Sequence, residues 1–106
     1  MDRRLQLDDE LRELQTEVLG YQHTYFEPPE SIRMEYDAVV YSRSVLNVRR
    51  ANNKSYLTRD VYRVTVISRD PETPMPKALQ EHFERCAPER FFVRDNLHHF
   101  PFTIYY

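Results

Sequence analysis

The sequence predicts a small α+β domain, in which an N-terminal helix and a second, short helix pack against a small, mostly antiparallel sheet that contains a long β-hairpin. Three patterns lead to this fold class. Leucines recur at helical spacing near the N-terminus, β-branched residues alternate through the middle of the chain, and aromatic residues alternate at its end. The 106 residues, 41% hydrophobic and 30% charged, suit one soluble domain that spans residues 1–106.

Residues 2–19 are expected to form an amphipathic helix, because their apolar residues recur at spacings of four, three and four along the sequence. These residues are Leu7, Leu11, Leu14 and Val18. Asp2 is expected to cap the start of the helix, and Gly20 stands where a helix often ends. The charged residues of the opposite face are assigned to solvent: Asp8, Asp9, Glu10, Arg12 and Glu13.

The middle of the chain predicts an edge strand followed by a long hairpin. The short aromatic segment Tyr21–Glu27 is stopped by two prolines, so it is expected at the edge of a sheet. Asp37–Val45 contains a buried apolar run, and Tyr56–Arg69 is rich in β-branched residues. The polar segment between these two strands contains Asn52 and Asn53, which tolerate positive φ and suit a long exposed loop.

The last third predicts a turn, a short helix and a hairpin. Asp70–Pro76 carries three prolines, and Pro76 suits the first position of a helix that runs to about Phe83. Strands are expected at Glu89–Arg94 and at Phe100–Tyr106, joined through the turn-like segment Asp95-Asn96-Leu97.

The C-terminal strand carries more aromatic surface than a small core needs. One face holds Phe100, Phe102, Ile104 and Tyr106, and the other holds His99, Pro101, Thr103 and Tyr105. We interpret Tyr105 and Tyr106 as candidate interface residues, with Tyr105 and part of the aromatic surplus covered by another subunit. The alternative is an internal strand that is buried on both faces within one chain.

The side chains that could carry chemistry form no recognisable motif. The candidate soft metal ligands are His23, His82, Cys86, His98 and His99, and they include no paired zinc-ligand motif. The serines lie in no nucleophile-elbow sequence, and Cys86 is followed by Ala87-Pro88 without an oxyanion-hole signature. We therefore expect no enzymatic activity, no metal and no cofactor. The net charge of −2 gives no global attraction to nucleic acid or to anionic lipid, and no segment is long and apolar enough to span a membrane.

A local basic patch leaves nucleic-acid binding open. Arginines and a lysine cluster around the hairpin loop, next to Tyr41 and Tyr56. They are Arg43, Arg49, Arg50, Lys54 and Arg59. Basic side chains beside aromatic rings can bind a single strand, and a basic loop equally suits an acidic patch on a protein.

Several strings of residues, taken together, resemble a family of small tail proteins of long-tailed bacteriophages. The first strings are Tyr-Phe-Glu-Pro-Pro-Glu-Ser at 25–31, Met-Glu-Tyr at 34–36 and Val-Tyr-Ser at 40–42. Later strings are Asn-Asn-Lys-Ser-Tyr at 52–56, Tyr-Arg-Val-Thr-Val-Ile at 62–67, Arg-Asp-Pro at 69–71, Met-Pro at 75–76, Arg-Asp-Asn-Leu at 94–97 and Phe-Thr-Ile-Tyr-Tyr at 102–106. The resemblance covers nearly the whole chain from the first helix onward. The chain departs from the family pattern at Asp37, where proline is expected, and at His98-His99, where Asn-His is expected.

Proteins of this family are described as minor capsid or tail proteins and are similar in size and layout to tail terminators. The resemblance therefore implies a homo-oligomer, a hexameric ring that caps the tail tube, stops its growth and joins it to the head-side neck. The implied partners are the tail tube protein and a head-completion (neck) protein, and the implied location is the virion, after assembly in the bacterial cytoplasm. In this interpretation the hairpin loop contacts the tube or the adjacent subunit, through Arg49, Arg50 and Lys54 together with Asn52 and Asn53. The alternatives are another head–tail connector component, such as a head-closure or tail-to-head joining protein, and a small nucleic-acid-binding module.

Overall fold

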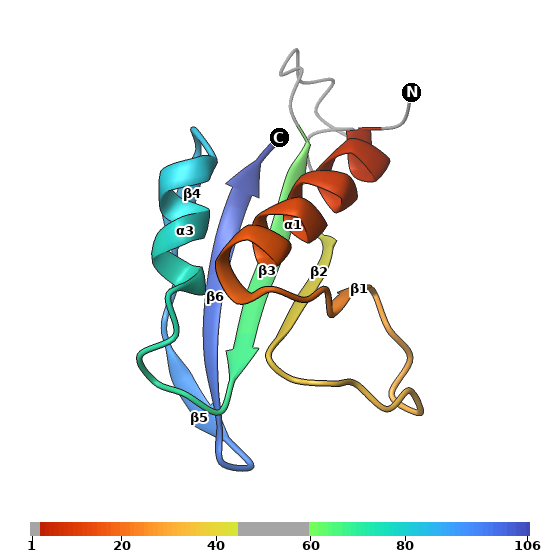
Figure 1. The fold of residues 1–106 in the computed structure, drawn as a ribbon. Coiled ribbons are helices and arrows are strands. Elements are labelled where there is room, and N and C mark those ends of the chain that lie inside the picture. Colours follow the sequence, from red (N-terminus) through yellow and green to blue (C-terminus); the bar gives the residue numbers. More distant parts are fainter. Residues whose placement is uncertain (1–2, 45–59) are drawn as a thin grey trace.

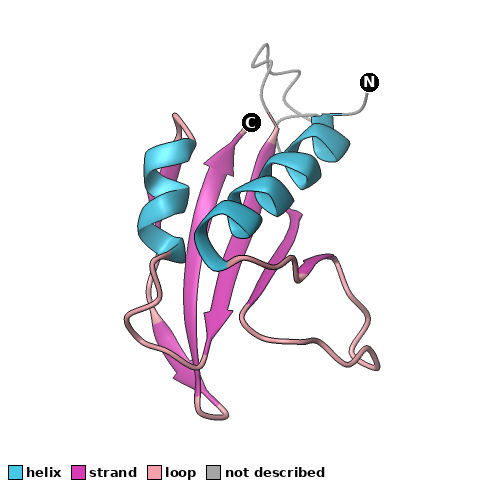
Figure 2. Ribbon diagram, viewed as in Figure 1, coloured by secondary structure: helices cyan, strands magenta, loops and turns pink. Residues whose placement is uncertain are grey.

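Two helices pack on one face of a six-stranded sheet in the computed structural model, which describes residues 3–44 and 60–106 (Figures 1 and 2). The strand order is β1-β2-β3-β6-β4, with β5 also paired to β6. Only β1 and β2 run parallel, and the other pairs are antiparallel. The predicted α+β class, with its mostly antiparallel sheet, an N-terminal helix and a second short helix, is confirmed.

The first helix, α1 (Arg3–Leu19), follows the predicted periodicity. Leu7 and Leu11 are fully buried against the sheet and Leu14 is 7% exposed. Gly20 ends the helix with a φ of +85°, which glycine adopts without strain, and its N–H donates to the Thr16 carbonyl at 2.9 Å. The predicted cap, Asp2, lies outside the described residues.

The predicted edge strand and the central hairpin strands are present. β1 (Thr24–Phe26) lies at one edge of the sheet beside β2 (Ala38–Arg43), which pairs with β3 (Val61–Ser68). The register places Val39 opposite Val66. Both side chains are fully buried, so this pairing helps to fix the face that meets the helices. The segment that joins β2 to β3 lies mostly outside the described residues.

The second helix, α3 (Met75–His82), agrees with the prediction to within one residue. Pro74 precedes it and Pro76 occupies its second position rather than the predicted first, where the missing N–H still costs no helical hydrogen bond. The side chains of Met75 and Leu79, on its inner face, are fully buried.

The strand predicted at Glu89–Arg94 is present only at its end, from Phe92 to Arg94. The chain instead forms β4 (Cys86–Pro88) and β5 (Phe92–Arg94), and both pair with β6 (Leu97–Tyr105). Pro88 lies opposite Phe102 and Phe92 lies opposite His99. From Pro88 to Phe92 the edge segment takes four residue steps, whereas β6 takes three from Phe102 to His99. The edge segment therefore contains one extra residue, a β-bulge, which separates β4 from β5.

The hairpin that joins β5 to β6 turns as the sequence predicts, but β6 begins earlier than predicted. Asp95 and Asn96 both adopt positive φ, at 54° and 63°, which suits a tight two-residue connection between antiparallel strands. Leu97 then starts β6, three residues before the predicted Phe100. The early start gives β5 a partner, and this hairpin forms the end of the sheet farthest from the start of α1 (Figure 1).

Candidate assembly surface

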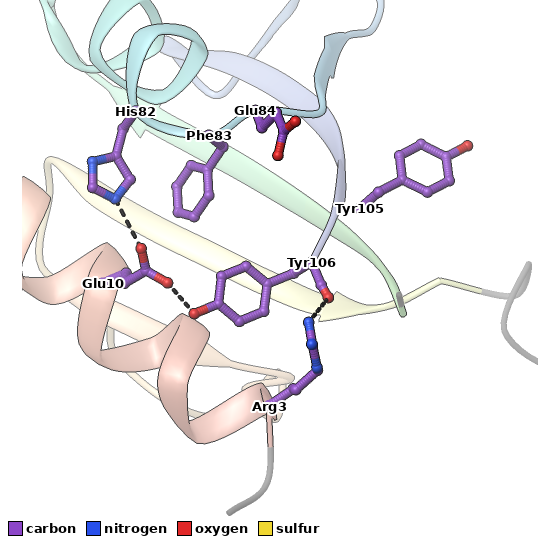
Figure 3. A pocket seen from close by; sticks show the side chains of 7 residues that line it. All are labelled: Arg3, Glu10, His82, Phe83, Glu84, Tyr105 and Tyr106. Atoms are coloured by element: carbon purple, nitrogen blue, oxygen red, sulfur yellow. Dashed lines mark hydrogen bonds and ion pairs between the residues drawn. The ribbon is translucent and has the colours of Figure 1, made fainter. Parts of the chain in front are cut away.

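The end of β6 sends its two last tyrosines to opposite sides of the sheet, as the alternation predicts. Tyr106 packs on the helix side, where its ring meets Phe83 edge-on with 6.2 Å between the ring centres. Tyr105 is half-buried and lies opposite Val61 in the register. Of the two predicted interface residues, Tyr106 thus has a role inside the subunit, and Tyr105 belongs to the face that carries no described helix (Figure 3).

A hollow of about 210 Å³ lies between α1, the end of α3 and the end of β6. Figure 3 shows the residues that line it: Arg3, Glu10, His82, Phe83, Glu84, Tyr105 and Tyr106. Glu10 is its central group. One carboxylate oxygen accepts a hydrogen bond from the Tyr106 hydroxyl, and the other lies 3.0 Å from Nε2 of His82. Arg3 donates to the Tyr106 carbonyl at 2.8 Å.

The electrostatics of this hollow suit a clamp rather than a reaction centre. Burial, together with the hydrogen bond to Glu10 and its negative charge, raises the pKa of Tyr106 to about 12. The hydroxyl therefore remains protonated at neutral pH and keeps donating to the carboxylate. Through this one acid, α1 is tied both to α3 and to the last strand.

A second carboxylate of α1, two residues nearer its start, binds the sheet. Asp8 accepts hydrogen bonds from the Tyr41 hydroxyl and from Nε of Arg12, each at 2.5 Å. Arg12 also donates to the Thr24 carbonyl at 3.0 Å. Burial acts to raise the pKa of Asp8, but the hydrogen bonds from Tyr41 and Arg12 outweigh it, so the pKa lies below its ordinary value. Burial of the Tyr41 hydroxyl, together with its hydrogen bond to Asp8, raises the pKa of Tyr41.

A buried glutamine completes the attachment of α1. Gln15 is fully buried, and its carbonyl oxygen accepts from the His23 amide at 2.9 Å and from the Thr24 hydroxyl at 3.1 Å. Its amide nitrogen donates to the Asp37 carbonyl at 3.0 Å. One side chain thus fixes the segment that enters β1 and the segment that enters β2.

The assignment of Asp8, Glu10 and Arg12 to a solvated helix face is only partly right. The Asp8 side chain is 16% exposed, whereas those of Glu10 and Arg12 keep 36% and 39% exposure but are also held by distant partners. Asp8 accepts a hydrogen bond from Tyr41, and Glu10 accepts one from Tyr106. Arg12 donates to the Thr24 carbonyl, and all three partners lie outside the helix. The periodicity of the helix contains no sign of these partners, and Gln15 likewise reads as an ordinary polar helix residue.

The face of the sheet opposite the helices is polar at its centre. Thr103 donates to a Glu89 carboxylate oxygen at 2.6 Å, and Nε of Arg63 lies 4.0 Å from the same oxygen. Tyr105 lies toward one end of this face, and Phe92, stacked on His99 with 4.5 Å between ring centres, lies toward the other. We call this surface the open face.

Three consecutive residues at the edge of the sheet expose apolar side chains: Phe91, just before β5, and Phe92 and Val93 within it. Phe91 is 47% exposed, Phe92 is 38% exposed and Val93 is 54% exposed. Phe91 stacks on His98 and Phe92 on His99, so the rings are held against the hairpin instead of turning freely. Large apolar side chains exposed close together are typical of surfaces that meet another protein. This run lies within the predicted strand Glu89–Arg94, and its composition alone does not distinguish an exposed edge from an ordinary strand.

The predicted loop contacts stay predictions. Arg49, Arg50, Asn52, Asn53 and Lys54 lie outside the described residues. At the base of that loop, the guanidinium of Arg43 lies 5.2 Å from the centre of the Phe26 ring, so this arginine also contributes to packing within the subunit.

The candidate metal and nucleophile residues are dispersed. Within residues 3–44 and 60–106, no three His, Cys, Asp or Glu side chains gather as the ligands of an ion would. Burial raises the pKa of the Cys86 thiol to about 11, so it is protonated at neutral pH and a weak nucleophile. No helix in the described part of the chain is both long and apolar enough to cross a membrane.

Comparison with models of known protein families, with curated proteins and with solved structures found no match to this chain.

Proposed function

We propose that this chain is a structural, non-catalytic subunit of a bacteriophage tail. In this proposal it is a tail terminator, which forms a hexameric ring that caps the tail tube and joins it to the head-side neck. The proposal rests on the family resemblance of the residue strings along nearly the whole chain and on the surface that the fold leaves available.

The observation that carries the proposal is that both described helices lie on one face of the sheet, next to exposed apolar side chains at its edge. Both described helices cover the same face (Figure 2). The open face carries Thr103 and Arg63 near its centre and Tyr105 toward one end. Next to it, the edge of the sheet at β5 exposes Phe92 and Val93, together with Phe91 just before the strand. A closed ring of subunits offers cover for such edges and apolar side chains, because each subunit meets a neighbour on either side.

The mechanism is therefore one of binding. The clamps made by Asp8, Glu10 and Gln15 hold α1 rigidly on the sheet, so a subunit presents a fixed shape to its neighbours. Rigid presentation lowers the conformational entropy lost on assembly. The ring would then offer one side to the tail tube protein and the other to a head-completion protein.

Electron microscopy of lysates tests this function. The phage would carry a nonsense codon in this gene, and a strain that supplies the protein in trans would serve as the control. We expect tails of uncontrolled length beside unattached heads, with normal tails restored by complementation. Tails of normal length that fail to join heads would indicate a head–tail connector instead. Normal infectious particles would reject a role in tail assembly.

A further inference from the structure

The segment Arg90–Arg94 combines apolar and basic groups at one edge of the sheet, and we call it the edge patch. All five residues are exposed. Phe92 lies on the open face, where it stacks on His99, whereas Phe91 turns to the helix side of the sheet and contacts His98 and Phe100. The guanidinium of Arg94 lies 5.7 Å from the centre of the Phe92 ring, which keeps a positive charge beside the aromatic surface. The five residues of the edge patch carry two positive charges and no acid. Asp95, in the turn that follows, carries a negative charge. Aromatic and arginine side chains are the groups most often found to anchor protein interfaces.

The outer side of α1 has the opposite charge, and we call it the acidic stripe. It consists of Leu5, Asp9, Glu13 and Glu17, which recur every four residues and are all exposed. No ion pair joins Asp9, Glu13 or Glu17 to any other described residue. Like charges four residues apart on a helix repel one another, so the stripe weakens α1 until a cation neutralises it. Leu5, 45% exposed, adds an apolar contact at the start of the stripe.

One subunit cannot bring these two surfaces together. β5 lies at the end of the sheet farthest from the start of α1 (Figure 1), and the residues of the stripe are exposed. Each surface is therefore free to meet a different neighbour.

We propose that the edge patch of one copy binds the acidic stripe of α1 on the next copy. Arg90 and Arg94 would neutralise acids of the stripe, and Phe92, with Arg94 beside its ring, would pack near Leu5. Because the two surfaces differ, the contact is head-to-tail, and a head-to-tail contact builds a ring wherever its rotation closes. This inference rests on the proposed function, since it supplies the subunit contact of the proposed ring.

Reciprocal charge reversal tests the contact in the full chain. One variant carries Arg90→Glu with Arg94→Glu, and the other carries Asp9→Lys with Glu13→Lys. The mass of each assembly would be measured by native mass spectrometry over a range of concentrations. A variant with Arg33→Glu and Arg69→Glu changes the net charge by as much as the first but leaves both surfaces intact. Circular dichroism would verify that every variant folds.

We expect the wild-type chain and the Arg33/Arg69 control to form the same oligomer. Each reversed variant alone should assemble at least about tenfold more weakly, because like charges then face each other. An equimolar mixture of the two variants should regain the oligomer. In that mixture each contact joins either two native surfaces or two reversed surfaces, and both pairs are opposite in charge.

Three outcomes would overturn the contact: folded variants that assemble like the wild type, a mixture that regains nothing, or a wild-type chain that stays monomeric throughout. None of them decides the proposed function, because the phenotype of the nonsense lysate is independent of how subunits meet. A normal lysate combined with charge-dependent assembly would reject the tail role and keep the contact.

Discussion

Replacing Gln15 by leucine should unfold the domain at a markedly lower denaturant concentration. Leucine keeps a similar volume and helix propensity but has no polar atoms. The change removes the partners of the His23 amide, the Thr24 hydroxyl and the Asp37 carbonyl, which now bond to Gln15 at 2.9, 3.1 and 3.0 Å. A buried polar group left without a partner costs about 1–3 kcal/mol.

At about 3 kcal/mol for each of the three groups, the loss of stability could reach about 9 kcal/mol at most. The loss is smaller if the groups shift and form hydrogen bonds with water. We therefore expect the free energy of unfolding to fall by roughly 2–5 kcal/mol, a large part of the ~5–15 kcal/mol typical of a domain. At about 4 °C per kcal/mol for a chain of this size, Tm should fall by roughly 8–20 °C.

The matched control is Gln22→Leu. Gln22 is exposed and donates only to the Thr16 hydroxyl, so its loss should change the free energy of unfolding by less than about 0.5 kcal/mol. Both variants and the wild type would be unfolded in urea and followed by circular dichroism. A Gln15→Leu protein as stable as Gln22→Leu would show that the buried glutamine does not hold α1 to the sheet.

The remaining predictions concern the core, acid stability and the loop. Val64→Asp should abolish folding, because Val64 is fully buried and the new charge would have no partner; a cooperative thermal transition in this variant would contradict the assigned facing of β3. Because the pKa of Asp8 is lower when folded, its contribution to stability is complete above its ordinary pKa of 3.8 and is lost as pH falls through the folded value. Asp8→Asn should therefore flatten the loss of stability below that pH, and an unchanged acid profile in urea titrations would count against the clamp. Changing the loop cations to alanine should weaken attachment to tails while melting temperature stays within about 3 °C, and loss of folding would reject a contact role. Those cations are Arg49, Arg50 and Lys54.

The elements of this fold could be predicted because their signals are local. Spacing of Leu7, Leu11 and Leu14 identifies α1, and Gly20 marks its end. The alternation in β3 identifies both the strand and its buried side, and Val64 lies on that side. Such patterns depend only on the geometry of one element, so they can be read before any partner is known.

The polar clamps could not be predicted in this way, because each joins residues that are distant in sequence. Asp8 meets Tyr41, and Glu10 meets Tyr106, only once the sheet has formed. A charged residue on an amphipathic helix usually faces water, so local patterning gives no sign of the partners that hold both acids.

The interrupted edge is a second feature that local propensity misses. Residues 89–94 have a strand-like composition, yet the bulge between Pro88 and Phe92 separates two short strands. The register of β6 decides where the bulge falls, and register is a property of the pair rather than of one strand. The exposure of Phe91 and Val93 follows from this edge position.

The most direct test of the proposed role uses purified components. Tail tube protein would be polymerised with and without this chain, and the tubes would be imaged by negative-stain electron microscopy. We expect shorter tubes, each with a six-fold ring at one end. Tubes of unchanged length with no protein at their ends would contradict the proposed role.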